Sequence, residues 1–465
     1  MAHFDKIVLV IGDLMLDRYI FGSVDRISPE ASCPIFQRKG KYIEQLGGAA
    51  NVAKQIRSFA YNIYIVGSIA NDEVGRNIKR LLTESEIKTE LICYDANVST
   101  LKERYITDLN QQILRVDEED FSPLTLETEK LIISFIENRK DEIDCIILSD
   151  YEKGVLTETF CREIIKLAMN LKISTIVDIK TPSINKYWGA TYIKGNQKEF
   201  STIFPEAQNI QDAYNQKEIL LDIKEKFNAC NIVITCGKNG LIAVDSKSDV
   251  YNLPAEKKHI YDVTGAGDVV TAYLYWGFSN DMSFYETIYR ANLAASESVQ
   301  HLGNVTIHPR TILRSGKVVS ISDFLKMSKG LKTVFTNGCF DVIHAGHIDL
   351  IHQAKQLGDI LVIGLNSDSS IRRIKGRGRP VNTFEYRSMT LSALIDVDYI
   401  IEFEEDTPLE LITQIKPDIL VKGGDYSIDK IIGADFVASY NGEVRIIPHT
   451  FNISTTKILN HEHQR

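Results

Sequence analysis

The sequence lacks the marks of a secreted, membrane or zinc-knuckle protein. Its seven cysteines are an odd number and form no C-x-x-C pair, which argues against a disulfide framework and a cysteine zinc site. No apolar run approaches the ~18 residues of a membrane span, and the N-terminus has no signal-peptide layout. We therefore expect a cytoplasmic protein without a membrane partner.

Positive charge is scarce as well. The 465 residues carry 53 Lys and Arg against 62 Asp and Glu, a net charge of −9. Because such a surface repels phosphate backbones, we expect no nucleic-acid partner. The hydrophobic share of 44% is ample for a sizeable core. At ~100–200 residues per domain, the length predicts two or three domains.

Short apolar runs recur along the chain, and most end in a polar residue or glycine before an amphipathic stretch. Such β-branched runs predict strands buried on both faces, hence α/β domains with parallel sheets and helical crossovers. Ligands bind outside the carboxyl ends of these strands. The runs cover residues 6–13, 61–68, 144–150, 174–180, 231–237, 332–338, 359–366 and 417–424.

Three regions depart from this rhythm. Residues 18–46 and 98–117 alternate polar and apolar side chains, which predicts a small half-exposed sheet. The second of them fits either a surface hairpin or part of a lid over an active site. Residues 308–331 are basic and polar without a clear strand. We therefore predict a first domain over residues 1–315, a connector over 316–331 and a second domain over 332–465.

A glycine-rich turn, D-V-T-G-A-G-D at 262–268, precedes an apolar helical stretch. Its small residues Gly265, Ala266 and Gly267 let backbone amides approach an anion at the helix start. The chain has no Walker A motif, so phosphates must be cradled in another way. Asp268 enters the helix in its first turn, where a carboxylate serves either as a catalytic base or as a favourable helix N-terminal charge.

This turn resembles the signature of the ribokinase/PfkB carbohydrate kinases, and further segments resemble that family's motifs in the same order over residues 5–305. They are Gly12-Asp13, G-G-A-A-N-V-A at 47–53, Asn196-x-x-Glu199, Thr235-x-Gly237-x-x-Gly240, and Asn292 in the helix that borders the adenine. The resemblance implies a three-layer α/β/α ribokinase-like domain with a small β lid, using ATP and Mg²⁺. One departure is Lys194-Gly195-Asn196, where K-P-N is common.

The resemblance also implies roles. Asp268 takes the proton of a sugar hydroxyl, while the amides of 265–268 stabilise the transferred phosphoryl group. Asn196 and Glu199 are implied to organise the phosphates and, indirectly, magnesium. The residues implied to bind the nucleotide are Thr235, Gly237, Gly240 and Asn292. The sugar falls to Asp13, Gly47, Gly48 and Asn51, with tight helix packing as the alternative for the glycines. A sugar phosphate would meet Lys180 at a strand end or Arg115, which equally suits a solvated surface.

The second domain opens with K-T-V-F-T-N-G-C-F-D-V-I-H-A-G-H at 332–347. His344 and His347 are three residues apart, so they share a face if a helix begins there. Because no third ligand or H-E-x-x-H pattern accompanies them, phosphate binding is favoured over zinc. The imidazoles and the helix start would donate to phosphate oxygens.

These motifs resemble the nucleotidyltransferase superfamily that includes glycerol-3-phosphate cytidylyltransferase, which implies a Rossmann-like α/β domain. The attacking sugar phosphate is already anionic, so the site needs charge stabilisation rather than a base. Residues 371–380 fit either a triphosphate-gripping loop or a solvated basic loop. The implied nucleotide-binding residues are Thr336, Lys375, Arg387 and, in I-S-T-T at 453–456, Ser454 and Thr455.

Together the halves resemble the bifunctional heptose kinase/adenylyltransferase family of Gram-negative bacteria. The resemblance implies phosphorylation of D-glycero-β-D-manno-heptose 7-phosphate at O1, then, after a separate phosphatase, AMP transfer to heptose 1-phosphate. The product, ADP-heptose, serves the lipopolysaccharide core. The family also suggests a homodimer through the kinase domain. The alternatives are another sugar kinase fused to a cytidylyl- or adenylyltransferase, an enzyme with one decayed domain, and a non-enzymatic sugar or nucleotide sensor.

Overall fold

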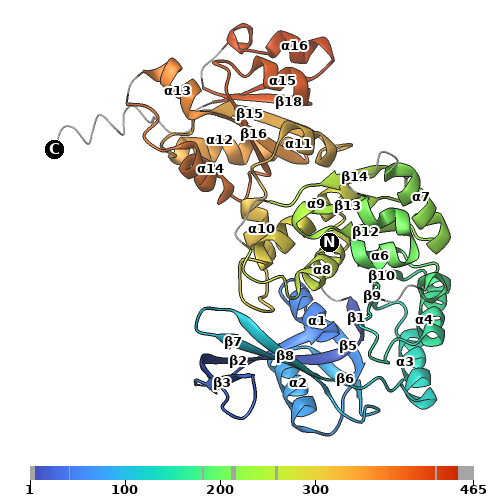
Figure 1. Ribbon diagram of the computed structural model, residues 1–465. Helices are drawn as coiled ribbons and strands as arrows, with labels where there is room; N and C mark the ends of the chain where they lie inside the picture. The colour runs from blue at the N-terminus through green and yellow to red at the C-terminus, as the bar shows by residue number, and fades with distance from the viewer. Residues whose placement is uncertain are drawn as a thin grey trace. The chain divides into compact units, whose positions relative to one another are not determined.

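The computed structural model describes residues 6–40, 42–180, 183–210, 216–256, 260–376, 378–424 and 427–448. The chain divides into two compact units, Met1–Pro309 and Arg310–Arg465 (Figure 1). Among the helices of the described ranges, none combines the length and apolar character needed to cross a membrane.

The first unit is built on a nine-stranded sheet that is parallel from β6 to β12, with β13 and β14 added antiparallel. Its strand order confirms the parallel α/β prediction. In spatial order, the strands are β14 (Val250–Leu253), β13 (Leu241–Val244), β12 (Asn231–Thr235), β11 (Tyr192–Asn196), β10 (Ser174–Asp178), β9 (Ile143–Ser149), β1 (Ile7–Gly12), β5 (Ile63–Ser68) and β6 (Lys88–Cys93).

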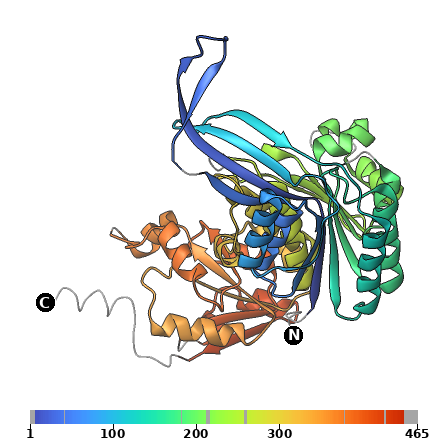
Figure 2. The same cartoon turned by 90° about the horizontal axis from the view of Figure 1, so that it is seen from below.

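Helices cover both faces of this sheet. On one face α3 (Leu126–Asn138), α4 (Glu158–Leu171) and α7 (Gln216–Phe227) bury their apolar stripes against alternate strand residues. On the other face α1 (Ala49–Arg57) and α8 (Ala266–Ser279) contact the strands, and α9 (Phe284–Ser298) packs beside α8. The result is the expected three-layer α/β/α domain, seen edge-on in Figure 2.

A second, smaller sheet in this unit confirms the strands expected in residues 18–46 and 98–117. Because β7 pairs in parallel with β2, residues 98–117 belong to this sheet and are not an isolated hairpin. Figure 2 shows β2 and β3 extending away from the central sheet. We call this sheet the lid; it comprises β2 (Leu14–Ile27), β3 (Pro34–Arg38), β4 (Ile43–Gly48), β7 (Thr100–Thr107) and β8 (Gln112–Glu118).

The second unit holds a five-stranded parallel sheet, which confirms the Rossmann-like prediction. Its strand order is β17 (Tyr399–Phe403), β16 (Ile360–Asn366), β15 (Thr333–Gly338), β18 (Ile419–Gly423) and β19 (Glu443–Ile447). The helices of this sheet are α12 (Ala345–Lys355), α13 (Asp368–Lys375), α14 (Phe384–Ser392), α15 (Leu409–Ile415) and α16 (Ala434–Ser439).

The segment expected as a connector, residues 316–331, packs within the second unit. Val318 forms a parallel bridge with Ile400, and α11 (Ile321–Met327) follows. The buried ring of Phe324 meets Tyr399 edge-on at 5.6 Å. Sequence periodicity over this short helix is weak, so its burial is set by the strand that it covers rather than by its own pattern.

Candidate active sites

The glycine turn begins α8 with a left-handed residue. Gly265 has a φ of 73°, and a Cβ there would collide with Asn304 and lie 2.9 Å from Nδ2 of Asn51. Only glycine combines that backbone with such close packing. A Cβ on Gly267 would lie 2.8 Å from the Lys194 ammonium. The start of α8 therefore presents backbone amides beside a cation, as an anion site requires.

Asp268 is buried in the first turn of α8, with 3% of its surface exposed. Nδ2 of Asn51 donates to one carboxylate oxygen at 2.7 Å, and the Tyr151 hydroxyl donates to the other. Burial raises the pKa of Asp268 to about 6, while the two hydrogen bonds oppose that rise. At neutral pH the group is thus an ionised carboxylate able to take a proton.

Two adjoining cavities lie around this carboxylate. A cavity of about 220 Å³ is lined by Asp268, Tyr151 and Asp178, and one of about 770 Å³ shares Asn196, Thr235 and Gly267 with it. The larger cavity is walled by apolar side chains, among them Val263, Val270 and Val299, which suit a flat ring. The structure therefore brings together the predicted nucleotide residues Asn196, Thr235, Gly237, Gly240 and Asn292 beside Asp268.

Asn196 and Glu199 form a reciprocal capping box at the start of α6 (Gln197–Ile203). The Glu199 amide donates to Oδ1 of Asn196 at 2.9 Å, and the Asn196 amide donates to Oε2 of Glu199 at 2.7 Å. Oε1 of Glu199 pairs with Lys180 at 2.9 Å. Lys180 thus lies at the nucleotide side of the small cavity, which it also lines.

Asp13, directly after β1, accepts hydrogen bonds from backbone amides of the loop that follows β9. Its carboxylate accepts the amides of Tyr151 at 2.8 Å, Lys153 at 3.1 Å and Val155 at 3.2 Å. Burial, together with the charge of Asp150, raises the pKa of Asp13 to about 6. Both oxygens of Asp13 thus help to shape the loop after β9, and its predicted contact with sugar hydroxyls stays a prediction.

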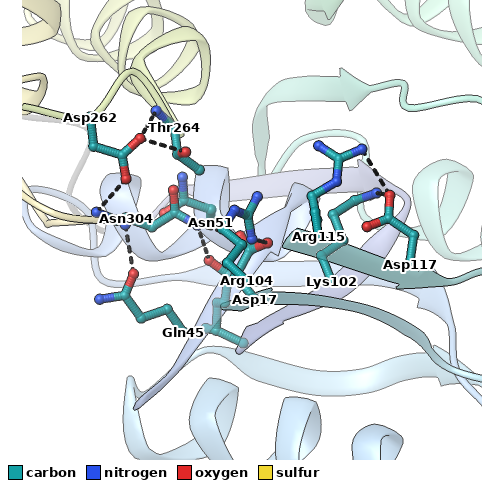
Figure 3. A network of polar contacts seen from close by, with 12 residues as sticks. Asp17, Gln45, Asn51, Lys102, Arg104, Arg115, Asp117, Asp262, Thr264 and Asn304 are labelled. Carbon is teal, nitrogen blue, oxygen red and sulfur yellow. Dashed lines mark hydrogen bonds and ion pairs between the residues drawn. The ribbon is translucent and has the colours of Figure 1, made fainter. Parts of the chain in front are cut away.

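A polar cluster on the inner side of the lid escaped the sequence analysis (Figure 3). Asp17 on β2 is 3% exposed; it pairs with Arg104 of β7 and accepts from Nδ2 of Asn304 at 2.8 Å. Oδ1 of Asn304 is buried without a hydrogen-bond partner among the described residues. In the sequence, Asp17 is marked only as an acidic residue, followed by Arg18, within a largely apolar stretch.

The predicted glycines Gly47 and Gly48 make room for this cluster and its neighbours. A Cβ on Gly47 would come within 2.7 Å of Oδ2 of Asp17. Gly48 has a φ of 58°, and a Cβ there would lie 2.5 Å from the Asp13 carbonyl oxygen. Close packing, the alternative that we left open, is therefore evident at both positions.

Arg115 lies on the exposed lid strand β8, apart from Lys180. Half of its side chain is exposed, and it pairs with Asp117 at 2.9 Å, as Figure 3 shows. Lys102 of β7 reaches the same carboxylate at 3.2 Å. The two cations predicted for a sugar phosphate are thus in different parts of the unit.

In the second unit, the two histidines come together at the start of α12. His344 is its N-cap residue, and its ring stacks on that of His347 with centroids 3.8 Å apart. Thr336 on β15 is 1% exposed, and its hydroxyl has no hydrogen-bond partner among the described residues. A helix start, two imidazoles and a strand hydroxyl are suited to phosphate oxygens.

Arg387 is a buried side chain that links the segments around Cys339, Asn382 and Asp368. It is 1% exposed, donates to the carbonyl oxygens of Cys339 at 2.8 Å and Asn382 at 3.1 Å, and pairs with Asp368 at 2.7 Å. Lys375 ends α13 with an exposed side chain. The predicted residues Ser454 and Thr455 lie outside the described residues.

Comparison with known proteins assigns a class to each unit. Residues 6–310 match the pfkB family of carbohydrate kinases, and residues 335–461 match the cytidylyltransferase-like family. The fold of phosphofructokinase-2 from Escherichia coli, solved in complex with potassium, superposes with a TM-score of 0.55 at 16% identity, covering 71% of this chain and 99% of that one. Ribokinase from Arabidopsis thaliana, solved with ribose and ATP, gives 0.52 at 15% identity over 68% and 98%.

Relatives also match along nearly the whole chain. Bifunctional protein HldE of Campylobacter fetus is 39% identical over 97% of this chain and 98% of its own length. The HldE proteins of Campylobacter jejuni and Trichlorobacter lovleyi are 39% and 36% identical, each over 97% of this chain and over 96% and 94% of their own lengths. The chain therefore belongs to the HldE family of bifunctional proteins.

Proposed function

We propose that this bifunctional enzyme carries out two steps of ADP-heptose synthesis. The first unit transfers the γ-phosphoryl group of ATP to O1 of D-glycero-β-D-manno-heptose 7-phosphate, which yields the 1,7-bisphosphate and ADP. After a separate phosphatase removes the 7-phosphate, the second unit transfers AMP from ATP to heptose 1-phosphate and releases pyrophosphate. ADP-heptose then supplies the lipopolysaccharide core. The union of a pfkB unit with a cytidylyltransferase-like unit in one chain supports this pairing of reactions.

The observation that carries the kinase assignment is the buried, doubly anchored Asp268. Its carboxylate takes the proton of the O1 hydroxyl while the oxygen attacks the γ-phosphorus and ADP departs. The amides of residues 265–268 and the Lys194 ammonium beside Gly267 stabilise the charge on the moving group. The apolar cavity next to Thr235 and Asn292 holds the adenine.

We assign the sugar to the lid side of Asp268. Asp17 and the open Oδ1 of Asn304 offer acceptors for its hydroxyls, and Asn51 touches both Asp268 and the space around Gly265. Arg115 on β8 and Lys180 both remain candidates for the 7-phosphate, since each is a cation that already has one carboxylate partner, Asp117 and Glu199 respectively. Because Glu199 belongs to the capping box at the nucleotide side of the small cavity, its ion pair with Lys180 also favours a contact of Lys180 with the nucleotide phosphates.

Magnesium fits this site only as an ion held mainly by the nucleotide. The described residues contain no group of three or more His, Cys, Asp or Glu that could bind a metal. Both oxygens of Glu199 are already bonded, so Glu199 and Asn196 would act through water. Mg²⁺ usually keeps several waters and binds substrate phosphates, and it would neutralise charge on them here.

In the second unit, a phosphate oxygen of heptose 1-phosphate attacks the α-phosphorus of ATP. His344, His347 and Thr336 donate to the crowded phosphorus centre, and the cations of residues 371–380, Lys375 included, meet the pyrophosphate. Arg387 would support these donors indirectly, because its hydrogen bond to the Cys339 carbonyl oxygen fixes the loop that leads to His344. The unit thus needs no general base.

We further propose a cytoplasmic homodimer that joins through the kinase unit. The lid strand β8 is an edge strand whose residues are all exposed, including Ile113, Leu114 and Val116. An exposed apolar edge invites pairing with a second copy. Light scattering on the full chain tests this: twice the mass of 52.5 kDa is expected, and a monomer at micromolar concentration would contradict it.

The experiment for the function is a product assay with defined sugars. Heptose 7-phosphate with ATP should give the 1,7-bisphosphate, and heptose 1-phosphate should react with ATP far better than with CTP. Fructose 6-phosphate and ribose serve as controls for the kinase. Preference for CTP, or for a hexose or pentose over heptose 7-phosphate, would overturn the named function in favour of another nucleotide-sugar enzyme.

A further inference from the structure

The loop that follows β9, residues 150–155, is held more firmly than a surface loop needs to be. Asp13 accepts three of its amides, and Oδ1 of Asp150 accepts the Glu152 amide at 2.9 Å. Oδ2 of Asp150 in turn accepts the Tyr187 hydroxyl at 2.7 Å and pairs with Lys186. The buried carboxylates of Asp13 and Asp150 thus both fix the backbone around Tyr151.

Tyr151 points from this loop at the reacting carboxylate. Its hydroxyl donates to Oδ1 of Asp268, while Asn51 donates to Oδ2, so the plane of the carboxylate is held from both sides. Each oxygen keeps a lone pair with which to accept the sugar proton. Tyr151 also lines the small cavity. Burial, followed by the charges of Asp268 and Asp178, raises its pKa, so the phenol remains a donor.

We propose that Tyr151 is a positioning residue for the kinase reaction: it orients Asp268 and stabilises its ionised form by a hydrogen bond from the phenol. The inference rests on the proposed kinase function and adds a residue to it. The charged groups that face Asp268 from other elements are Asp178 at the end of β10 and Lys194 on β11, with Asp17 of the lid beyond Tyr151. The charges of Asp178 and Lys194 act on Asp268 in opposite directions. The Tyr151 hydroxyl is the hydrogen-bond donor that reaches Asp268 from the loop after β9.

The test is Tyr151→Phe, which removes the hydroxyl and keeps the ring. Charge-assisted hydrogen bonds are the strong ones, so we expect kcat of the kinase to fall about tenfold or more, with KM for the sugar phosphate changed less than about twofold. The acidic limb of the kcat–pH profile should move upward by about one pH unit, since the carboxylate loses a donor. The substrate phosphate titrates equally with both enzymes and cancels in this comparison.

Tyr275→Phe is the matched control. Tyr275 is buried on the same helix as Asp268 and donates to another carboxylate, Oδ2 of Asp144, at 3.1 Å. It should leave the kinase kcat and its pH profile unchanged. Adenylyl transfer and ADP binding to the kinase unit, measured on the same Tyr151→Phe preparation, verify that the chain is folded.

Three outcomes are distinguishable. A folded Tyr151→Phe enzyme with the wild-type kcat and pH limb would overturn the proposal. So would a loss that appears only in KM for the sugar, because it would make Tyr151 a substrate-binding residue. If the wild-type chain itself fails to phosphorylate heptose 7-phosphate, the proposed function fails instead.

Discussion

The candidate sites of the two units are built from different kinds of side chain. Around the kinase turn, Asp268, Asp13 and Asp178 are all buried, and burial raises the pKa of each. In the second unit, imidazoles and a strand hydroxyl gather at a helix start, and the buried carboxylate Asp341 is held ionised. Burial alone would raise the pKa of Asp341, but amides of Asn382 and Val381 and the Arg379 guanidinium lower it.

The difference follows from the nucleophile that each reaction uses. A sugar hydroxyl must lose its proton as it attacks, so a base with a pKa near 6 is useful. A sugar phosphate is already an anion, so its attack needs no carboxylate base and gains instead from groups that stabilise negative charge. Both reactions use ATP, so the difference between the sites reflects the acceptor: a hydroxyl that must lose a proton in the first unit and an ionised phosphate in the second.

The largest expected effect is that of Asp268→Asn. The amide cannot take the hydroxyl proton, so kinase kcat should fall by about 10²–10⁴-fold while adenylyl transfer stays within about twofold of wild type. Rates of both reactions in one preparation provide the measurement. Parallel loss of both activities would contradict the separation of the two sites.

The reciprocal change is His344→Ala. Removing one preorganised donor at a developing charge costs about 10²–10³-fold, so adenylyl transfer should fall by that much and the kinase should be unaffected. His352→Ala on the exposed face of the same helix is the matched control. Unchanged adenylyl transfer in His344→Ala would remove the imidazole from the proposed site.

A smaller effect concerns stability. The folded-state pKa of Asp268, about 6, lies above the unfolded value of 3.8, so ionisation of this group disfavours folding above pH 6 and the penalty fades as the pH falls toward 4. Asp268→Asn removes that titration. The quantity to follow is the free energy of unfolding of Asp268→Asn minus that of wild type, measured on the kinase unfolding transition. This difference should be about 1 kcal/mol smaller at pH 5 than at pH 7, because the wild-type penalty fades over that range. A pH-independent difference would show that Asp268 titrates normally.

Much of this organisation was predictable from local patterns. The eight apolar runs all became strands. The glycine turn and the histidine pair each indicated a candidate site, because the residues that suggest its chemistry lie within a few positions of one another in the sequence. Tyr151 was not predictable, since it reaches Asp268 from 117 residues away. Asn304 and Asp17, 287 residues apart, meet only through the fold. The edge strand β14 and its neighbour β13 were missed because each has only four residues.

The most direct test of two different sites on one chain follows the phosphorus atoms of ATP. ATP labelled at the γ- or the α-phosphorus is supplied to the same enzyme, first with heptose 7-phosphate and then with heptose 1-phosphate. We predict that γ-label alone enters the sugar product of the first reaction and α-label alone that of the second, and that Asp268→Asn abolishes only the γ-transfer. Transfer of the γ-label in both reactions, or loss of both transfers in Asp268→Asn, would contradict the account.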